Sequence, residues 1–145
     1  MLWLRKSKKG FTLIELMVVV AIIGVLALLG LRLYTGQQDK AKNAIVKANA
    51  GTIQTLIQAE LADKKVADVS GDTHMDAIVS AAGIHNPFIG SQQTESHWAT
   101  AVPTSGQVEG DIYVWQDASD LIFHVNGWGA GGSTKVYDTD LTARK

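Results

Sequence analysis

One carboxylate, Glu15, stands at the start of an otherwise apolar segment, and its setting demands a chemical partner. No residue from Leu16 to Leu31 is charged or strongly polar. An ionisable group at the centre of a bilayer costs roughly 2.5–3.5 kcal/mol on insertion scales, and an isolated buried charge is strongly unfavourable unless a partner meets it. We therefore expect that something in the membrane or in an assembly meets Glu15.

The other residues that could do chemistry are scattered. Four histidines lack any metal-ligand spacing such as that of HExxH, and we interpret them as surface or strand residues: His74, His85, His97 and His124. Asp138 and Asp140 alternate as carboxylates on a strand face do. They could join a calcium site, although a solvated strand edge is the favoured interpretation.

A glycine-rich segment near the C-terminus is expected to be a turn, because neither the Lys-Ser/Thr ending of a phosphate-binding loop nor a helix follows it: Gly127, Gly129, Gly131 and Gly132. The chain has no cysteine, which excludes both a cysteine nucleophile and a disulfide. No serine motif is recognisable. We therefore expect no enzymatic activity, no cofactor and no bound metal.

The segment from Phe11 to Leu31 has the length of one membrane span. At about 1.5 Å per residue it measures on the order of 30 Å, one hydrocarbon thickness. The residues before Gly10 include no acidic side chain and four basic ones: Arg5, Lys6, Lys8 and Lys9. The positive-inside rule therefore predicts a single-pass protein of the cytoplasmic membrane, with its N-terminus inside and the rest of the chain exported.

The run GFTLIELMVVVAIIG, from Gly10 to Gly24, resembles the class III signal and first helical turns of bacterial type IV pilins and of the related type II secretion pseudopilins. The resemblance implies that a prepilin peptidase cuts the Gly10–Phe11 bond and methylates Phe11, the new N-terminal residue. It also implies that Glu15 meets the free amine of Phe11 on a neighbouring subunit. That amine exists only after cleavage.

Two other interpretations of the N-terminal segment explain less. An ordinary secretory signal peptide ends in a small-residue cleavage site after its apolar run, whereas the expected cut here precedes the run. A generic single-span anchor gives no reason for Gly10 followed by Phe11, Thr12 and Glu15. The chain nevertheless departs from many Gram-negative type IV pilins, because it has neither a C-terminal disulfide loop nor a proline near Arg32.

Removal of the leader changes the charge balance. The whole chain has 13 Lys and Arg against 14 Asp and Glu, so loss of the four basic leader residues leaves 9 against 14, a net charge of −5. A surface of that sign does not favour binding to a nucleic-acid backbone. No direct nucleic-acid partner is expected.

No proline interrupts the chain from Phe11 to Lys65, which predicts one helix of about 50 residues. Its outer half has an apolar stripe that should pack against the rest of the chain: Ile45, Ala50, Ile53, Ile57 and Leu61, with Val46 beside them. Polar residues are expected on the other side: Lys40, Lys47, Gln54 and Gln58. Three glycines are candidates for local bending or for close helix packing in lipid: Gly24, Gly30 and Gly36.

The rest of the chain is predicted to form one small domain. Residues 64–71 should end the long helix, and a short helix capped by Asp72 or Thr73 should run to Ala82, where Gly83 stops it and Pro87 forbids continuation. After a loop from Gly90 to Gly110, strands are expected at 112–115, 121–125 and 136–141, with a turn at 117–120. Three large side chains should cover the helix stripe: Trp98, Trp115 and Phe123.

The predicted fold class is therefore α+β, a long N-terminal helix packed on a small antiparallel sheet, as the resemblance also implies. We expect a leader at 1–10, a transmembrane and filament-core half of the helix at 11–31, an amphipathic half at 32–65 and a globular domain at 66–145.

The function that the resemblance implies is that of a structural subunit of a type IV pilus, exported from the membrane into an extracellular filament. Its expected partners are further copies of the chain, the prepilin peptidase, membrane lipid before assembly, and an inner-membrane assembly platform with its ATPase. Two alternatives remain open. One is a major-type pseudopilin of a secretion or competence system, and the other is a membrane-tethered binding module with an uncleaved leader.

Overall fold

The computed structural model describes residues 10–101, 103, 107–117 and 122–142. The chain divides into two compact units, residues 1–37 and 38–145, and one helix, α1 (Leu13–Asp63), contributes to both. The helix predicted from Phe11 to Lys65 is therefore confirmed, with each end shorter by two residues.

In the first unit, the apolar half of α1 is exposed along its whole length. Its large apolar side chains range from 48% exposed at Val19 to 76% at Leu13. Among the described residues, α1 is the one helix that is long and apolar enough to cross a membrane. It stays helical through the three candidate bending positions, which remain predictions: Gly24, Gly30 and Gly36.

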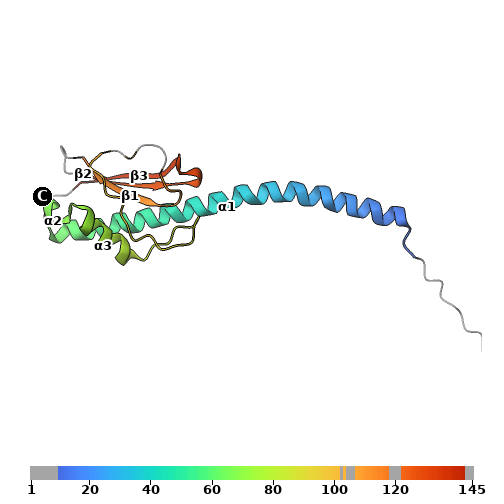
Figure 1. Cartoon of the computed structure of the whole chain (residues 1–145), viewed down its shortest axis with the longest axis horizontal. Helices are drawn as coiled ribbons and strands as arrows, with labels where there is room; N and C mark the ends of the chain where they lie inside the picture. The colour runs from blue at the N-terminus through green and yellow to red at the C-terminus, as the bar shows by residue number, and fades with distance from the viewer. Residues whose placement is uncertain (1–9, 102, 104–106, 118–121, 143–145) are drawn as a thin grey trace, which may run out of the picture. The chain divides into compact units, whose positions relative to one another are not determined.

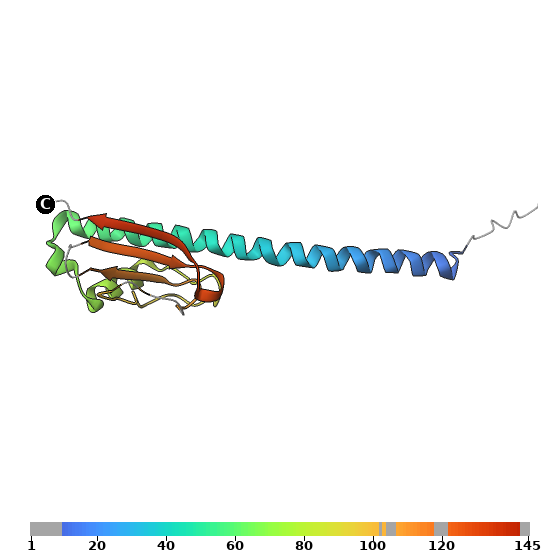
Figure 2. The same cartoon turned by 90° about the horizontal axis from the view of Figure 1, so that it is seen from above.

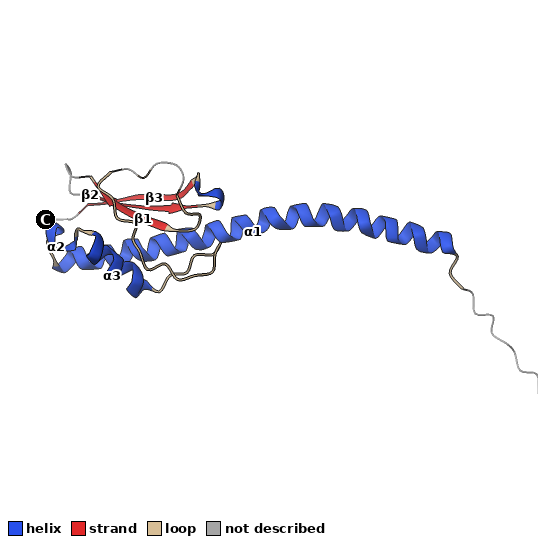
Figure 3. Cartoon of the chain, viewed as in Figure 1, coloured by secondary structure: helices blue, strands red, loops and turns tan. Residues whose placement is uncertain are grey.

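The second unit has the predicted α+β fold (Figures 1 and 3). It combines the outer half of α1 with two short helices, α2 (Val66–Val69) and α3 (Asp72–Ala82). Its antiparallel sheet has the order β1-β2-β3, with β1 (Ile112–Gln116), β2 (Ile122–Trp128) and β3 (Lys135–Thr142). A 3-10 turn, η1 (Ala130–Gly132), joins β2 to β3. Figure 2 shows the strands running alongside the outer half of α1.

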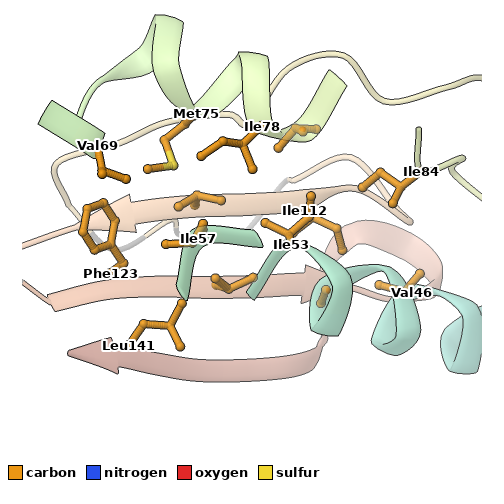
Figure 4. Close-up of a cluster of buried hydrophobic side chains, with 14 residues drawn as sticks. Val46, Ile53, Ile57, Val69, Met75, Ile78, Ile84, Ile112, Phe123 and Leu141 are labelled. Carbon is orange, nitrogen blue, oxygen red and sulfur yellow. The ribbon is translucent and has the colours of Figure 1, made fainter. Parts of the chain in front are cut away.

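The core lies between one face of this sheet and the helices (Figure 4). α1 contributes four fully buried residues, spaced four, three and four apart as one helix face requires: Val46, Ala50, Ile53 and Ile57. The sheet, the short helices and the loop after α3 supply the remaining members: Val69, Met75, Ile78, Val79, Ile84, Ile112, Val114, Phe123, Val125 and Leu141.

One residue, Ile45, was wrongly assigned to the buried stripe of the helix. Ile45 is 48% exposed, whereas its neighbour Val46 is fully buried. Adjacent helical residues point about 100° apart, so the sheet can contact only one of the two closely. Gln54, expected on the polar side, is half-buried and accepts a hydrogen bond from the Tyr137 hydroxyl on β3.

The predicted role of Trp115 in covering the stripe is also wrong. Ile112 and Val114 point into the core, and strand alternation therefore places Trp115 on the opposite face of the sheet. There its ring stacks on His124 at 3.8 Å between centroids, and its indole N–H donates to Asn126 Oδ1 over 2.9 Å.

The other two side chains expected over the stripe do belong to the core. Phe123 is fully buried on β2. Trp98 is partly buried and packs against the core cluster, with its ring centroid 6.0 Å from that of Phe123.

Local boundaries differ from the sequence predictions in three places. The N-cap of α3 is Gly71 rather than Asp72 or Thr73, whereas Gly83 ends the helix in the left-handed conformation as expected. Residues 64–71 end α1 but also form α2. β2 runs past Val125 to Trp128, so Gly127 lies in a strand and only the later glycines form the predicted turn. Leu121 and turn residues 118–120 lie outside the described residues.

A buried amide, Asn86, organises the loop that leads to β1. Its Nδ2 donates to Glu109 O and to Asp111 Oδ1, each over 2.7 Å, and its Oδ1 accepts from Phe88 N over 2.8 Å. Gly110 fits beside this amide at a φ of 86°, where an added Cβ would come 2.3 Å from Asn86 Oδ1.

Gly110→Ala is therefore expected to destabilise the protein by about 1–3 kcal/mol more than Gly83→Ala does. Both glycines have positive φ, but a Cβ at Gly83 meets nothing within 4 Å, so Gly83→Ala carries the backbone cost alone. Thermal unfolding of the full chain in detergent, followed by tryptophan fluorescence, compares them. Equal shifts in Tm would show that Asn86 moves aside freely.

Candidate functional site

Thr12 and Glu15 form a capping box at the N-terminal end of α1. The Thr12 backbone N–H donates to Glu15 Oε2 over 2.9 Å, and the Glu15 N–H donates to Thr12 Oγ1 over 3.4 Å. The Thr12 hydroxyl also donates to Glu15 Oε2, over 2.8 Å. The two side chains thus satisfy backbone N–H groups that the start of a helix leaves without partners.

Sequence reasoning singled out Glu15 but missed its relation to Thr12. The available signal was a threonine three residues before a glutamate, directly ahead of an apolar run, which is typical of this cap. Both hydrogen bonds to the carboxylate end on Oε2, and no described residue donates to Oε1. Glu15 can therefore cap its own helix and still offer one oxygen to a cation.

Gly10 and Phe11 precede this cap and lie outside regular secondary structure. Both residues are exposed, and the Phe11 side chain reaches 87%. Exposed peptide segments outside helices and strands are the preferred sites of proteolysis. The Gly10–Phe11 bond has this character, and the capped helix begins two residues later.

The four histidines lie in separate places, each with its own neighbour. His85 is exposed, and His124 on β2 has its Nδ1 2.6 Å from Asp140 Oδ1, so the prediction of surface or strand positions is right for these two. The other two are half-buried, on α3 and in the loop before β1. His74 Nε2 lies 3.5 Å from Glu60 Oε2, and His97 Nε2 lies 3.0 Å from Asp111 Oδ2.

Asp138 and Asp140 occupy an exposed strand face, as favoured from the sequence. Their side chains are 55% and 64% exposed on β3. Asp138 accepts a hydrogen bond from Asn126 Nδ2 over 2.5 Å and lies 3.5 Å from Lys135 Nζ, while Asp140 pairs with His124. Within the described residues, no group of three or more His, Cys, Asp or Glu side chains could hold a metal ion.

The outer face of the sheet also carries a buried phenol. The Tyr113 ring stacks on His97 at 4.3 Å between centroids. Burial raises the pKa of Tyr113, and the nearby Asp111 carboxylate acts in the same direction, against a hydrogen bond from the Val108 N–H that lowers it. The aromatic and histidine side chains on this face pack against one another, in keeping with a structural role.

Comparison with known proteins identifies the N-terminal pattern. Residues 5–31 match the family model of the prokaryotic N-terminal methylation motif. The chain is 32% identical over 132 residues to the type IV major fimbrial protein FimA of Dichelobacter nodosus, an alignment that covers 90% of this chain and 78% of that protein. No solved structure is significantly similar to the chain.

Two further relatives match over shorter stretches. Fimbrial protein EcpB of Eikenella corrodens is 42% identical over 73 residues, which are 50% of this chain and 45% of that protein. The type IV major alpha-pilin of Moraxella bovis is 37% identical over 67 residues, which are 46% of this chain and 42% of that protein.

An apolar N-terminal helix that continues into a small antiparallel α+β unit is a pilin-like architecture. Together with the methylation motif and the extended similarity to FimA, it shows that the chain belongs to the type IV pilin family.

Proposed function

We propose that this chain is the structural subunit of a type IV pilus, held in the cytoplasmic membrane by its apolar helix and then polymerised into a surface filament. The observation that carries the proposal is the exposure of every large apolar side chain from Leu13 to Leu33. Apolar surface of this extent requires lipid or other apolar helices as cover. Lipid covers it before assembly, and the same helix half of neighbouring copies covers it in the filament.

Pairing in the filament supplies the partner that Glu15 requires. Cleavage of the Gly10–Phe11 bond creates an amine on Phe11, and this ammonium meets the Glu15 carboxylate of an adjacent copy. A paired charge in an apolar interior is tolerable, whereas an unpaired one is not. The capping box supports this arrangement, because Glu15 Oε1 has no donor among the described residues.

Processing and export follow from the same segment. The basic residues of the leader hold the N-terminus on the cytoplasmic side, where the prepilin peptidase cuts after Gly10 and methylates Phe11. Residues 1–10 act as the leader, 11–31 as the span, 32–65 as the amphipathic half of the helix and 66–145 as the exported domain. An assembly platform and its ATPase extract the subunit from the membrane. The relatives carry fimbrial and pilin names, which favours a pilus over a secretion pseudopilus.

Electron microscopy of material sheared from cells, combined with mass spectrometry of the N-terminus, tests this function. The expected result is filaments made of this chain, with methylated Phe11 as the first residue. Membrane-bound protein that begins at Met1, with no filament, would instead identify a tethered binding module.

Replacing Gly10 tests the processing step. Gly10→Leu is expected to block cleavage, because a bulky side chain then stands at the scissile bond, whereas Gly10→Ala is a mild change. The blocked protein should stay in the membrane with the mass of the full chain. Normal filaments whose subunits still begin at Met1 would contradict the proposed processing.

A further inference from the structure

The second unit carries unpaired charges of opposite sign at its two ends. At its start, α1 presents the exposed Lys40 and Lys47. At the far end of α1, the short segment through α2 to the start of α3 presents three exposed carboxylates: Asp63, Asp68 and Asp72. None of these five side chains has an ion-pair or hydrogen-bond partner among the described residues.

Nearby charges of opposite sign do not neutralise the net charge of either end. Residues 38–47 hold three lysines against one carboxylate, Asp39, a balance of +2. Residues 60–72 hold four carboxylates against Lys64 and Lys65, a balance of −2. Lys64 is already committed to Glu60, whose pKa is lowered chiefly by the hydrogen bond from this ammonium. The acidic end therefore keeps three carboxylates against the single cation Lys65.

The two ends are too far apart to interact within one copy. Lys40 and Lys47 lie 23 and 16 residues before Asp63 on one helix, about 35 and 24 Å at 1.5 Å per residue. Both distances are about three or more times the Debye length of about 8 Å at physiological ionic strength. Figure 1 places α2 at the C-terminal end of α1. Charges of opposite sign so placed can meet only between copies.

We propose that the basic end of one copy, formed by Lys40 and Lys47, contacts the acidic end of another copy, formed by Asp63, Asp68 and Asp72. The proposal rests on the filament function proposed above. A contact between two different surfaces of the same chain is heterologous, and it propagates along an open polymer unless rotation closes a ring. Electrostatic complementarity of this kind sets orientation and register more than raw affinity. The apolar helices thus drive association, and the charged ends select one axial register.

A second copy fits these observations better than an anionic lipid surface does. Lipid headgroups would engage Lys40 and Lys47 but would leave the acidic end unpartnered. A second copy accounts for both ends at once and for their net charges, which are equal in magnitude, +2 and −2.

Charge reversal in the full-length chain tests the contact. The variants are Lys40→Glu with Lys47→Glu, Asp63→Lys with Asp68→Lys, and all four changes combined. Asp72 stays in place because a carboxylate is favourable in the first turn of α3. Glu95→Lys is the control, since Glu95 is an exposed loop carboxylate that belongs to neither charged segment, 38–47 or 60–72.

Each double variant is expected to lower the yield of sheared filaments about tenfold, because weak exposed pairs become repulsive at every repeat of the polymer. The combined variant should recover yield to within about twofold of wild type, because the reversed charges pair again. Glu95→Lys should assemble normally. Unchanged thermal unfolding and membrane pools would confirm that every variant folds.

Three results would overturn the contact and leave the proposed function standing. The first is wild-type filament yield from both double variants, and the second is failure of the combined variant to recover. The third is a smaller membrane pool for Lys40→Glu with Lys47→Glu alone, which the combined variant does not restore. This result would indicate that Lys40 and Lys47 bind anionic lipid. Absence of filaments from the wild-type chain would overturn the proposed function and this contact with it. Filaments from wild type and from both double variants would overturn the contact alone.

Discussion

Glu15→Gln is expected to leave export, cleavage and membrane residence intact while lowering the filament fraction roughly a hundredfold or more. Removing one partner of a buried charge pair costs about 3–5 kcal/mol, because the other charge is left uncompensated. Glutamine can still form the capping box with Thr12, so the start of α1 is preserved and only the charge is lost. The change therefore isolates pairing with Phe11 from the local role of Glu15 in the helix.

The membrane pool and the sheared filament fraction are measured side by side in the same cells. Glu15→Leu serves as the companion variant, because it removes both the charge and the cap. Both variants should accumulate as processed protein in the membrane. Wild-type filament yield from Glu15→Gln and also from Glu15→Leu would eliminate the pairing mechanism and leave Glu15 as a signal for the peptidase alone.

Ile53→Ala is expected to destabilise the second unit by about 2–5 kcal/mol, because a fully buried side chain is removed from a packed core and leaves a cavity. Ile53 is 0% exposed on the α1 face that meets the sheet. Ile45, on the same helix, is 48% exposed, so Ile45→Ala should change stability by less than about 0.5 kcal/mol. The two substitutions share chemistry, helix and helix propensity, and they differ in burial.

Thermal unfolding of the full chain in detergent, monitored by near-ultraviolet circular dichroism, measures this difference. If Ile45→Ala lowered stability as much as Ile53→Ala does, α1 would have to be rotated about its axis so that Ile45 also faces the sheet. That result would support the buried stripe predicted from the sequence alone, which includes Ile45. Melts recorded at several protein concentrations separate unfolding from association.

Local signals were enough to predict α1, α3 and most strand positions, but not α2. α1 spans nearly the predicted range because apolar and helix-favouring residues run without a proline between Phe11 and Lys65. α3 ends where Gly83 adopts a φ of 62°, a conformation that glycine takes at little cost. The third strand, predicted at 136–141, runs from Lys135 to Thr142. Such signals act within a few residues, so one sequence carries them without knowledge of the fold.

The motif at the start of the chain was also legible from residue types alone. A single carboxylate in a span-length apolar run, preceded by Gly10 and four basic residues, pointed to the family that the comparisons show. The capping partner of Glu15, Thr12, could have been predicted from the spacing of three residues between them. This cap depends on residues three positions apart in the sequence, not on distant parts of the chain.

Only the tertiary structure decided which faces are buried. Residues 112–115 are apolar at every position, so period-two alternation alone could not show that Ile112 and Val114 face α1 while Trp115 faces away. Ile45 and Val46 are likewise adjacent and both apolar, and contact with the sheet selects Val46. The grouping of Asp68 and Asp72 with Asp63 at one end of the second unit also appeared only when α2 and α3 were placed beside α1. Burial depends on which distant segment covers a face, and residue types that suit either face leave that choice to packing.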